Sequence, residues 1–314
     1  TGSSCPPNTA ATISSNAFNV TLGSDASARR VCAQIVDTAG WASDVTCSDA
    51  YKVDTTDPTQ SFSIASSTAG SNGWYKALSI KATLTDDHSK IASAKYCITT
   101  SSTCTPGTSA TVSSNAITVP LGSNASAQRI CVQATDNAGR TSATSCSGTY
   151  KVDKTVPTQA FSVASSTAGS NGWYKALSIK ATLTDAHSKI ASAKYCTTTG
   201  SSCTPGTAAT VSSNAITVAL GNNASAQKVC VQATDNAGWT SSPTCTGTYS
   251  VDNAKPTASF TASASGTSIT VNASTSSDAH SKIKTYYYSK NGGSSYSSST
   301  SSSFTFSGLT PLKN

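Results

Sequence analysis

The chain has 314 residues, of which only 11% are charged, and it carries a net charge of +7 with no methionine. Its Lys and Arg residues are scattered along the sequence, which argues against the clustered basic surface of a nucleic-acid-binding protein. No apolar run is long enough to cross a bilayer, so we expect no membrane span in this part of the chain. Frequent Thr, Val, Ile and Tyr residues favour strands over helices.

A repeat of 99 residues organises the chain: Cys5, Cys104 and Cys203 lie at this interval, and so do Trp74 and Trp173. Residues 60–158 and 159–257 differ at 20 of 99 positions. A period of this length suits a small β-sandwich rather than a short solenoid repeat. In chain order we expect the C-terminal part of a module, two whole modules and the N-terminal part of a divergent module. We call them the N-terminal segment (1–56), the first whole module (57–155), the second whole module (156–254) and the C-terminal segment (255–314).

The strands within a module are predicted by alternation of apolar and polar residues. SIKATLTD places Ile80, Ala82 and Leu84 on one face of a strand. NAITVPL and RICVQATD alternate in the same way, with the inward positions Ile117, Val119, Leu121, Ile130, Val132 and Ala134. Short strands separated by Gly, Asn, Ser and Pro clusters predict an all-β fold. We expect immunoglobulin-like antiparallel sandwiches of about seven strands each and no helix.

The cysteines predict hairpin disulfides. Cys131 and Cys146 flank the turn DNAG, so strands that fold back there bring the two side chains opposite each other. Cys97 and Cys104 close a smaller hairpin. With the 99-residue period, the predicted pairs are Cys32–Cys47, Cys97–Cys104, Cys131–Cys146, Cys196–Cys203 and Cys230–Cys245. Disulfides at this density indicate an oxidising, extracellular setting. Zinc is the rival interpretation, and the absence of a CxxC motif argues against it.

Cys5 is the eleventh cysteine and has no partner in this scheme. TGSSC at residues 1–5 matches TGSSC at 199–203, where Cys203 is expected to pair with Cys196 seven residues earlier. By the same offset, the partner of Cys5 is expected before residue 1. We therefore predict a structural half-cystine rather than a reactive thiol.

Three segments resemble the joints between tandem bacterial immunoglobulin-like (Big-type) domains: VDTTDPT (53–59), VDKTVPT (152–158) and VDNAKPT (251–257). ATDNAG (134–139) and NGWYKALSIKATLTD (72–86) are also similar to those domains. The resemblance implies a β-sandwich fold and a role as a stalk or adhesin segment of a surface protein. It implies no single biochemical activity.

All three histidines lie in one recurring motif, DDHSKI or DAHSKI, at His88, His187 and His280. A His near an Asp suggests acid–base chemistry. No nucleophile or second partner recurs with the motif, so we expect a turn in which the Asp accepts backbone N–H bonds. Without a set of nucleophile, base and orienting group, we expect no enzyme.

The topology of a sandwich predicts one metal site. The loop after the second strand, the loop of the last hairpin and the incoming linker lie at the same end of such a fold. Asp153, Asp185, Asp235 and Asn236 then meet at a module junction, where their oxygens could bind a structural Ca²⁺. We expect no other cofactor, and the sequence identifies no ligand-binding residues.

The sequence therefore predicts a stalk or adhesin segment of a secreted or cell-surface protein, which projects a binding region from the cell. The alternative is the subunit of an extracellular filament, assembled head to tail by completing split modules. Expected partners are the neighbouring modules, other copies of the chain, or a glycan or protein on a host surface.

Overall fold

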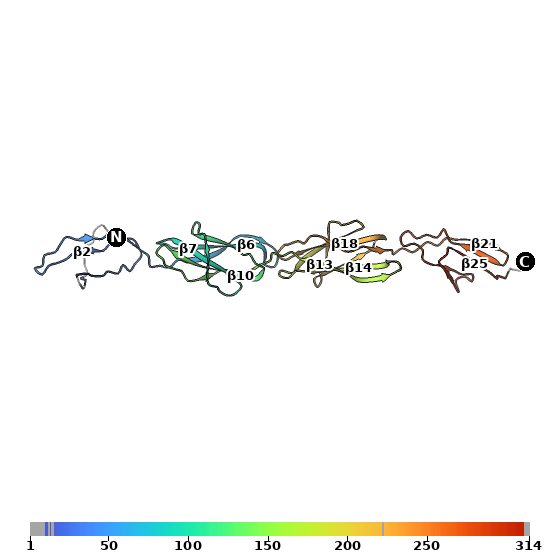
Figure 1. The fold of residues 1–314 in the computed structure, drawn as a ribbon, viewed down its shortest axis with the longest axis horizontal. Coiled ribbons are helices and arrows are strands. Elements are labelled where there is room, and N and C mark those ends of the chain that lie inside the picture. The colour runs from blue at the N-terminus through green and yellow to red at the C-terminus, as the bar shows by residue number, and fades with distance from the viewer. Residues whose placement is uncertain (1–9, 12, 14–15, 222, 311–314) are drawn as a thin grey trace. The chain divides into compact units, whose positions relative to one another are not determined.

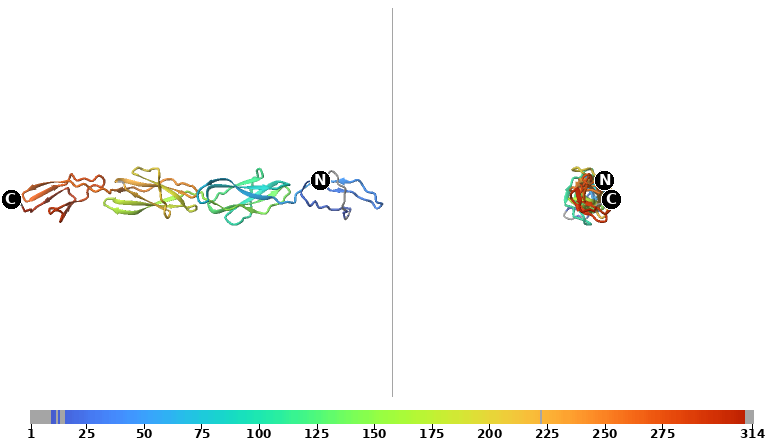
Figure 2. Two further views of the ribbon diagram at one scale, coloured as in Figure 1. Left: turned by 180° about the vertical axis from the view of Figure 1, so that it is seen from behind. Right: turned by 90° about the vertical axis from the view of Figure 1, so that its right-hand side faces the viewer.

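The computed structural model describes residues 10–11, 13, 16–221 and 223–310. These residues form strands and loops and contain no helix (Figures 1 and 2). The described residues thus include no helix long and apolar enough to cross a membrane. The chain divides into two compact units, Thr1–Thr155 with Asn236–Gly238, and Val156–Asp235 with Trp239–Asn314.

The first whole module is a sandwich of two sheets that share the long strand β10 (Ala125–Asp136). Strand β6 pairs with β5 and β9 in one sheet, and β7 pairs with β8 and β10 in the other. Strand β12 pairs with the first part of β10 and runs parallel to β6, which joins the sheets. The strands are β5 (Thr59–Ala69), β6 (Trp74–Thr85), β7 (Ile91–Thr99), β8 (Thr108–Ala110), β9 (Ala116–Pro120), β10 (Ala125–Asp136), β11 (Ser145–Cys146) and β12 (Tyr150–Val152).

The module has eight strands rather than about seven because its last strand is interrupted. Strand β11 pairs with the middle of β10 through Cys146, and β12 begins at Tyr150 and pairs further along. Between them, the Ser147 hydroxyl accepts a hydrogen bond from the Ile130 amide at 3.2 Å. The Ser147 hydroxyl thus accepts the hydrogen bond of an amide, that of Ile130, which would otherwise pair with the backbone of the adjacent strand.

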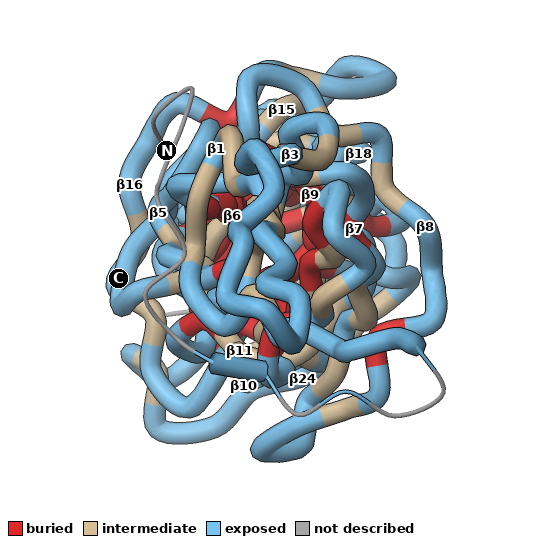
Figure 3. The backbone as a smooth tube through the Cα atoms, turned by 90° about the vertical axis from the view of Figure 1, so that its left-hand side faces the viewer, coloured by how far each residue is buried: buried red, intermediate tan, exposed pale blue. Residues whose placement is uncertain are grey.

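The core lies between the two sheets, where the alternation predicts it. Strand β6 contributes Leu78, Ile80, Ala82 and Leu84, and the facing strand β10 contributes Ile130, Val132 and Ala134. Figure 3 shows such buried positions in the interior, surrounded by exposed backbone. Burial of these apolar groups is the main favourable contribution to folding.

The second whole module repeats this arrangement with its own core of equivalent residues. Its strands are β13 (Thr158–Ala168), β14 (Trp173–Thr184), β15 (Ile190–Thr198), β16 (Thr207–Ala209), β17 (Ala215–Leu220), β18 (Ala224–Asp235), β19 (Thr244–Cys245) and β20 (Tyr249–Val251). The predicted fold class, immunoglobulin-like antiparallel sandwiches in repeats of about 99 residues, is confirmed.

The two segments each form a different part of this sandwich. The N-terminal segment has β1 (Ala26–Arg29), β2 (Cys32–Ala33), β3 (Thr46–Cys47) and β4 (Tyr51–Val53), paired β1–β4 and β2–β3. The C-terminal segment has β21 (Thr261–Ser265), β22 (Ser268–Asn272), β23 (Tyr286–Tyr288), β24 (Ser297–Ser299) and β25 (Ser303–Phe306). There β22 pairs with β21 and β25, and β23 pairs with β24.

Five disulfides join neighbouring parts of the chain: Cys32–Cys47, Cys97–Cys104, Cys131–Cys146, Cys196–Cys203 and Cys230–Cys245. Cys131 lies outside the apolar cluster between the sheets, yet it is fully buried. It is opposite Cys97 on one side and Cys146 on the other, so two disulfides lie side by side. Cys5 is outside the described residues.

Candidate functional site

Three segments of the first compact unit bring carboxylates together. Asp54 directly follows β4 in the incoming linker, Asp86 follows β6, and Asp136 is the last residue of β10. Each stands where a strand ends and the chain turns, so its side chain lies at the same end of the module. One carboxylate oxygen of each residue lies within 4.8 Å of the other two.

Asp86 and Asp136 each use one oxygen to hold a turn. Asp136 Oδ1 accepts the amides of Ala138 at 2.8 Å and Arg140 at 2.9 Å. Asp86 Oδ1 accepts the amide of Lys90 at 2.7 Å. Lys90 has a φ of 67°, a left-handed conformation that needs such local support in a residue other than glycine. The DDHSKI motif is thus a turn stabilised by its aspartate.

Asp54 ties the linker to the module. Its Oδ1 accepts the Thr56 amide at 3.0 Å, and its Oδ2 accepts the Ser89 amide at 2.9 Å. Hydrogen bonds, foremost from the Ser89 side chain, hold the pKa of Asp54 well below its ordinary value. This carboxylate is therefore charged at neutral pH, and it links the residues before the module to the 86–90 loop.

Two oxygens of this cluster have no partner. Asp86 Oδ2 and Asp136 Oδ2 are buried and accept no hydrogen bond from any described residue. Their residues are 9% and 1% exposed. A buried, uncompensated charge is costly, and the nearby carboxylates raise that cost. Ca²⁺ binds six to eight oxygens, including carboxylates and carbonyls. The three aspartates therefore form an arrangement that could hold a divalent cation.

Two further polar residues near the cluster, Asn137 and Asp25, form contacts with the surrounding loops. Asn137 donates its side-chain amide to the carbonyls of Ser89 at 2.8 Å and Lys90 at 3.1 Å, which holds the two loops together. Asp25 lies 3.7 Å from His88 Nδ1 and accepts the Thr55 hydroxyl. This hydroxyl and the Thr55 amide lower the pKa of Asp25.

The predicted residues of the second whole module lie at equivalent places. Asp185 follows β14 and Asp235 ends β18; both are buried, and carboxylate oxygens of the two lie within 4.8 Å of each other. Asp153 follows β12, is fully buried, and accepts the Thr155 amide at 2.9 Å. Asp153 and Asn236 belong to the first compact unit, and Asp185 and Asp235 to the second, so their predicted grouping stays a prediction. Sequence reasoning missed Asp54, Asp86 and Asp136, although the 99-residue spacing points to them.

The joint before the C-terminal segment has a simpler form of the same arrangement. Asp252 Oδ2 accepts the Ser281 amide at 3.1 Å, as Asp54 does from Ser89. Hydrogen bonds from Ser281 are the main cause of a lowered Asp252 pKa. Asp278 matches Asp86 and accepts the Lys282 amide at 3.1 Å. Among the described residues of that segment no strand corresponds to β10, and no third carboxylate joins the pair.

The lowered pKa of Asp54 predicts the pH range in which the linker loses its contact with the 86–90 loop. The unfolded value is about 3.9 and the folded value is lower, so ionised Asp54 stabilises the joint above about pH 4. This stability is lost as pH falls toward the folded pKa. The NMR shift of the Ser89 amide should stay constant from neutral pH to about pH 4 and change only below it. Ser89→Ala should move the Asp54 titration upward; a wild-type midpoint above about pH 4 would contradict this account.

No family model matches the sequence, and no curated protein matches it. Among solved structures, the chain is similar to the fibronectin(III)-like modules of CbhA from Clostridium thermocellum. The identity is 16% and the TM-score 0.29, and the match covers 61% of this chain and 94% of that chain.

Proposed function

We propose that the chain is a structural segment of an extracellular or cell-surface protein, a stalk of Big-type sandwiches whose joints are stiffened by Ca²⁺. Disulfides in the sandwich modules support an oxidising location.

The carboxylate cluster carries this proposal, because its three members come from different parts of the chain. Asp54 belongs to the linker, whereas Asp86 and Asp136 lie at the ends of two strands of the module. A cation bound to all three would therefore join linker and module through ionic contacts. Hinge motion would then require a cation–carboxylate contact to break. Pro58, within the same joint (53–59), restricts the backbone further.

Small-angle scattering of the whole chain tests the stiffening. With Ca²⁺ we expect a larger radius of gyration and a less flexible scattering profile than with a chelator. Asp136→Asn removes one of the proposed cation sites and should therefore reduce this response. Asp87→Ala is the matched control: Asp87 is exposed beside the cluster, and the second whole module has Ala186 at that position. Identical scattering with Ca²⁺ and with chelator would contradict the proposed stiffening.

A second candidate function is the subunit of a head-to-tail filament. The observation that favours it is exposed apolar side chains in both segments, including Ile35 at 68% exposure and Phe260 at 65%. In this function the partner would be another copy of the chain. The chain would then assemble into a filament instead of projecting a binding region from the cell.

A further inference from the structure

Two disulfides of the first whole module lie next to each other in one sheet. Cys131, in the middle of β10, is opposite Cys97 of β7 on one side and Cys146 of β11 on the other. The bonds in the structure are Cys97–Cys104 and Cys131–Cys146. The sulfur atoms of Cys97, Cys104 and Cys131 all lie within 4.8 Å of one another. Cys131 is thus bonded to one cysteine and lies close to two others.

The order of the strands sets the direction from which Cys97 approaches Cys131. Because β10 lies between β7 and β11 at this position, Cys97, Cys131 and Cys146 stand in a row with Cys131 in the middle. Side chains directly opposite each other across a sheet point to the same face. A thiolate attacks a disulfide sulfur from the side opposite the departing sulfur. A Cys97 thiolate that attacks Cys131 therefore has Cys146 as its leaving group.

Exposure decides where a thiol from solution can enter this group of sulfurs. Cys131 is fully buried, whereas Cys104 is partly exposed in the loop before β8. The residues before it, 100–103, are exposed. Arg129 donates to the Ser102 carbonyl at 3.1 Å, and a positive charge beside the loop favours the approach of a thiolate anion. A thiolate can thus reach Cys104 more readily than Cys131.

We propose that the two disulfides form a site that accepts a thiol and passes the exchange to the buried sulfur. In the first step a thiolate from solution attacks Cys104, which forms a mixed disulfide and releases the Cys97 thiolate. In the second step Cys97 attacks Cys131, so the Cys97–Cys131 bond forms and Cys146 leaves as a thiolate, which takes up a proton. Each step breaks one S–S bond and forms another. The entering thiol is oxidised to a mixed disulfide, and Cys146 is reduced to a thiol.

The exchange reaches the same new bond from either end of the row. Cys146 is also partly exposed, and its Sγ lies 3.8 Å from the Thr103 hydroxyl, next to Cys104. A thiol that attacks Cys146 frees Cys131, which then attacks Cys97 and releases Cys104. Both routes form the Cys97–Cys131 bond, so β7 and β10 stay covalently joined while the module takes up a thiol.

The second whole module has the same arrangement. Cys230 is fully buried and lies between Cys196 and Cys245 in the sheet. The sulfur atoms of Cys196, Cys203 and Cys230 lie within 4.8 Å of one another. The exchange is therefore expected in both whole modules, and it requires neither the proposed cation site nor filament assembly.

Disulfide mapping of the whole chain tests this exchange. The folded chain is incubated with a small excess of reduced glutathione at neutral pH, and free thiols are then blocked with N-ethylmaleimide in mild acid before digestion and mass spectrometry. We expect a peptide that joins Cys97 to Cys131, with glutathione on one of Cys104 and Cys146 and maleimide on the other. Cys97→Ser should abolish this peptide and leave the equivalent product of the second whole module unchanged.

Two variants that lack the same disulfide separate the row geometry from mere proximity. Cys104→Ser leaves a permanent thiol at Cys97, inside the row, whereas Cys97→Ser leaves one at Cys104, in the loop. Without added thiol, maleimide should label Cys146 as well as Cys97 in the first variant and Cys104 alone in the second. Intact pairing in the second whole module shows that each variant chain is folded.

A wild type and a Cys104→Ser variant that both lack the Cys97–Cys131 peptide would overturn the proposal. Equal labelling of Cys146 in Cys104→Ser and Cys97→Ser would overturn the role of the row. Peptides that join cysteines of different modules, in amounts similar to the Cys97–Cys131 peptide, would show exchange in unfolded chains and would also contradict the proposal.

Discussion

Replacing Cys131 and Cys146 together by alanine is expected to lower the free energy of unfolding of the first whole module by about 3 kcal/mol. The disulfide closes a sequence separation of 15 residues, and its loss returns chain entropy to the unfolded state. Cys131 is fully buried, so the lost sulfur adds a cavity cost. Together these effects are a large share of the stability of a domain of this size.

Hydrogen exchange followed by mass spectrometry measures this loss within the whole chain. Amides of β10 should exchange about 100-fold faster in the variant, from about 1.4 kcal/mol for each factor of ten. The amides of β18, in the intact second whole module, provide an internal reference. The corresponding variant without Cys97–Cys104, whose loop spans 7 residues, should show a smaller loss of about 2 kcal/mol. Unchanged exchange in β10 would show that the disulfide adds no stability.

Asp136→Asn is expected to have opposite effects with and without Ca²⁺. In chelator the amide replaces a buried unpartnered oxygen by a donor that faces two carboxylates, so the first whole module should be equally stable or more stable. In Ca²⁺ the wild type should gain about 2.7 kcal/mol at a cation concentration 100-fold above its dissociation constant. The variant should gain much less.

The same exchange measurement on β10 follows both solutions, and Asp87→Ala serves as the control that keeps the wild-type response. The turn is preserved in Asp136→Asn, because the Asn side-chain oxygen can still accept the Ala138 and Arg140 amides. A variant that loses stability equally in chelator and in Ca²⁺ would indicate that Asp136 has a role in folding alone.

Much of the sandwich could be predicted from the sequence because each strand buries one face. Alternation then separates inward from outward residues, as for Ile80 and Lys81, and a shift by one position would reverse every side chain. The interruption between β11 and β12 was not predictable, because it depends on the Ser147 hydroxyl reaching the Ile130 amide in the adjacent strand.

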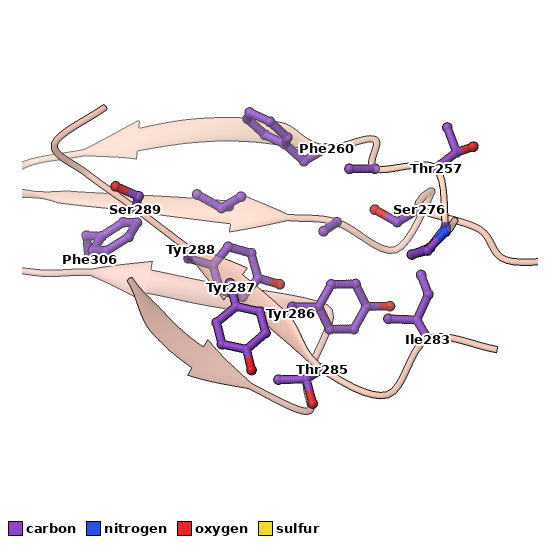
Figure 4. Close-up of a pocket in the computed structure, with 14 residues that line it drawn as sticks. Thr257, Phe260, Ser276, Ile283, Thr285, Tyr286, Tyr287, Tyr288, Ser289 and Phe306 are labelled. Carbon is purple, nitrogen blue, oxygen red and sulfur yellow. The ribbon is translucent and has the colours of Figure 1, made fainter. Parts of the chain in front are cut away.

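The candidate site could be predicted only as a set of loops at one end of the module. The predicted residues Asp153, Asp185 and Asp235 lie 99 positions after Asp54, Asp86 and Asp136, so the repeat identifies these three as their equivalents. The period cannot show which oxygens lack partners, because this depends on loop geometry. It also cannot show that Asn137 uses its side chain to hold two carbonyls rather than to face the cluster. Phe260, which lines a groove of the C-terminal segment (Figure 4), is exposed, whereas the equivalent Phe62 is partly buried against the core of its module. This difference depends on strand pairing, which the sequence around Phe260 does not show.

Calorimetric titration of the whole chain with Ca²⁺ tests the central claim most directly. The proposed joint predicts Ca²⁺ uptake that a chelator reverses, and one ion fewer bound per chain in Asp136→Asn than in the wild type or in Asp87→Ala. No heat of binding in the wild type, or the same number of ions bound by Asp136→Asn, would contradict a cation-stiffened joint.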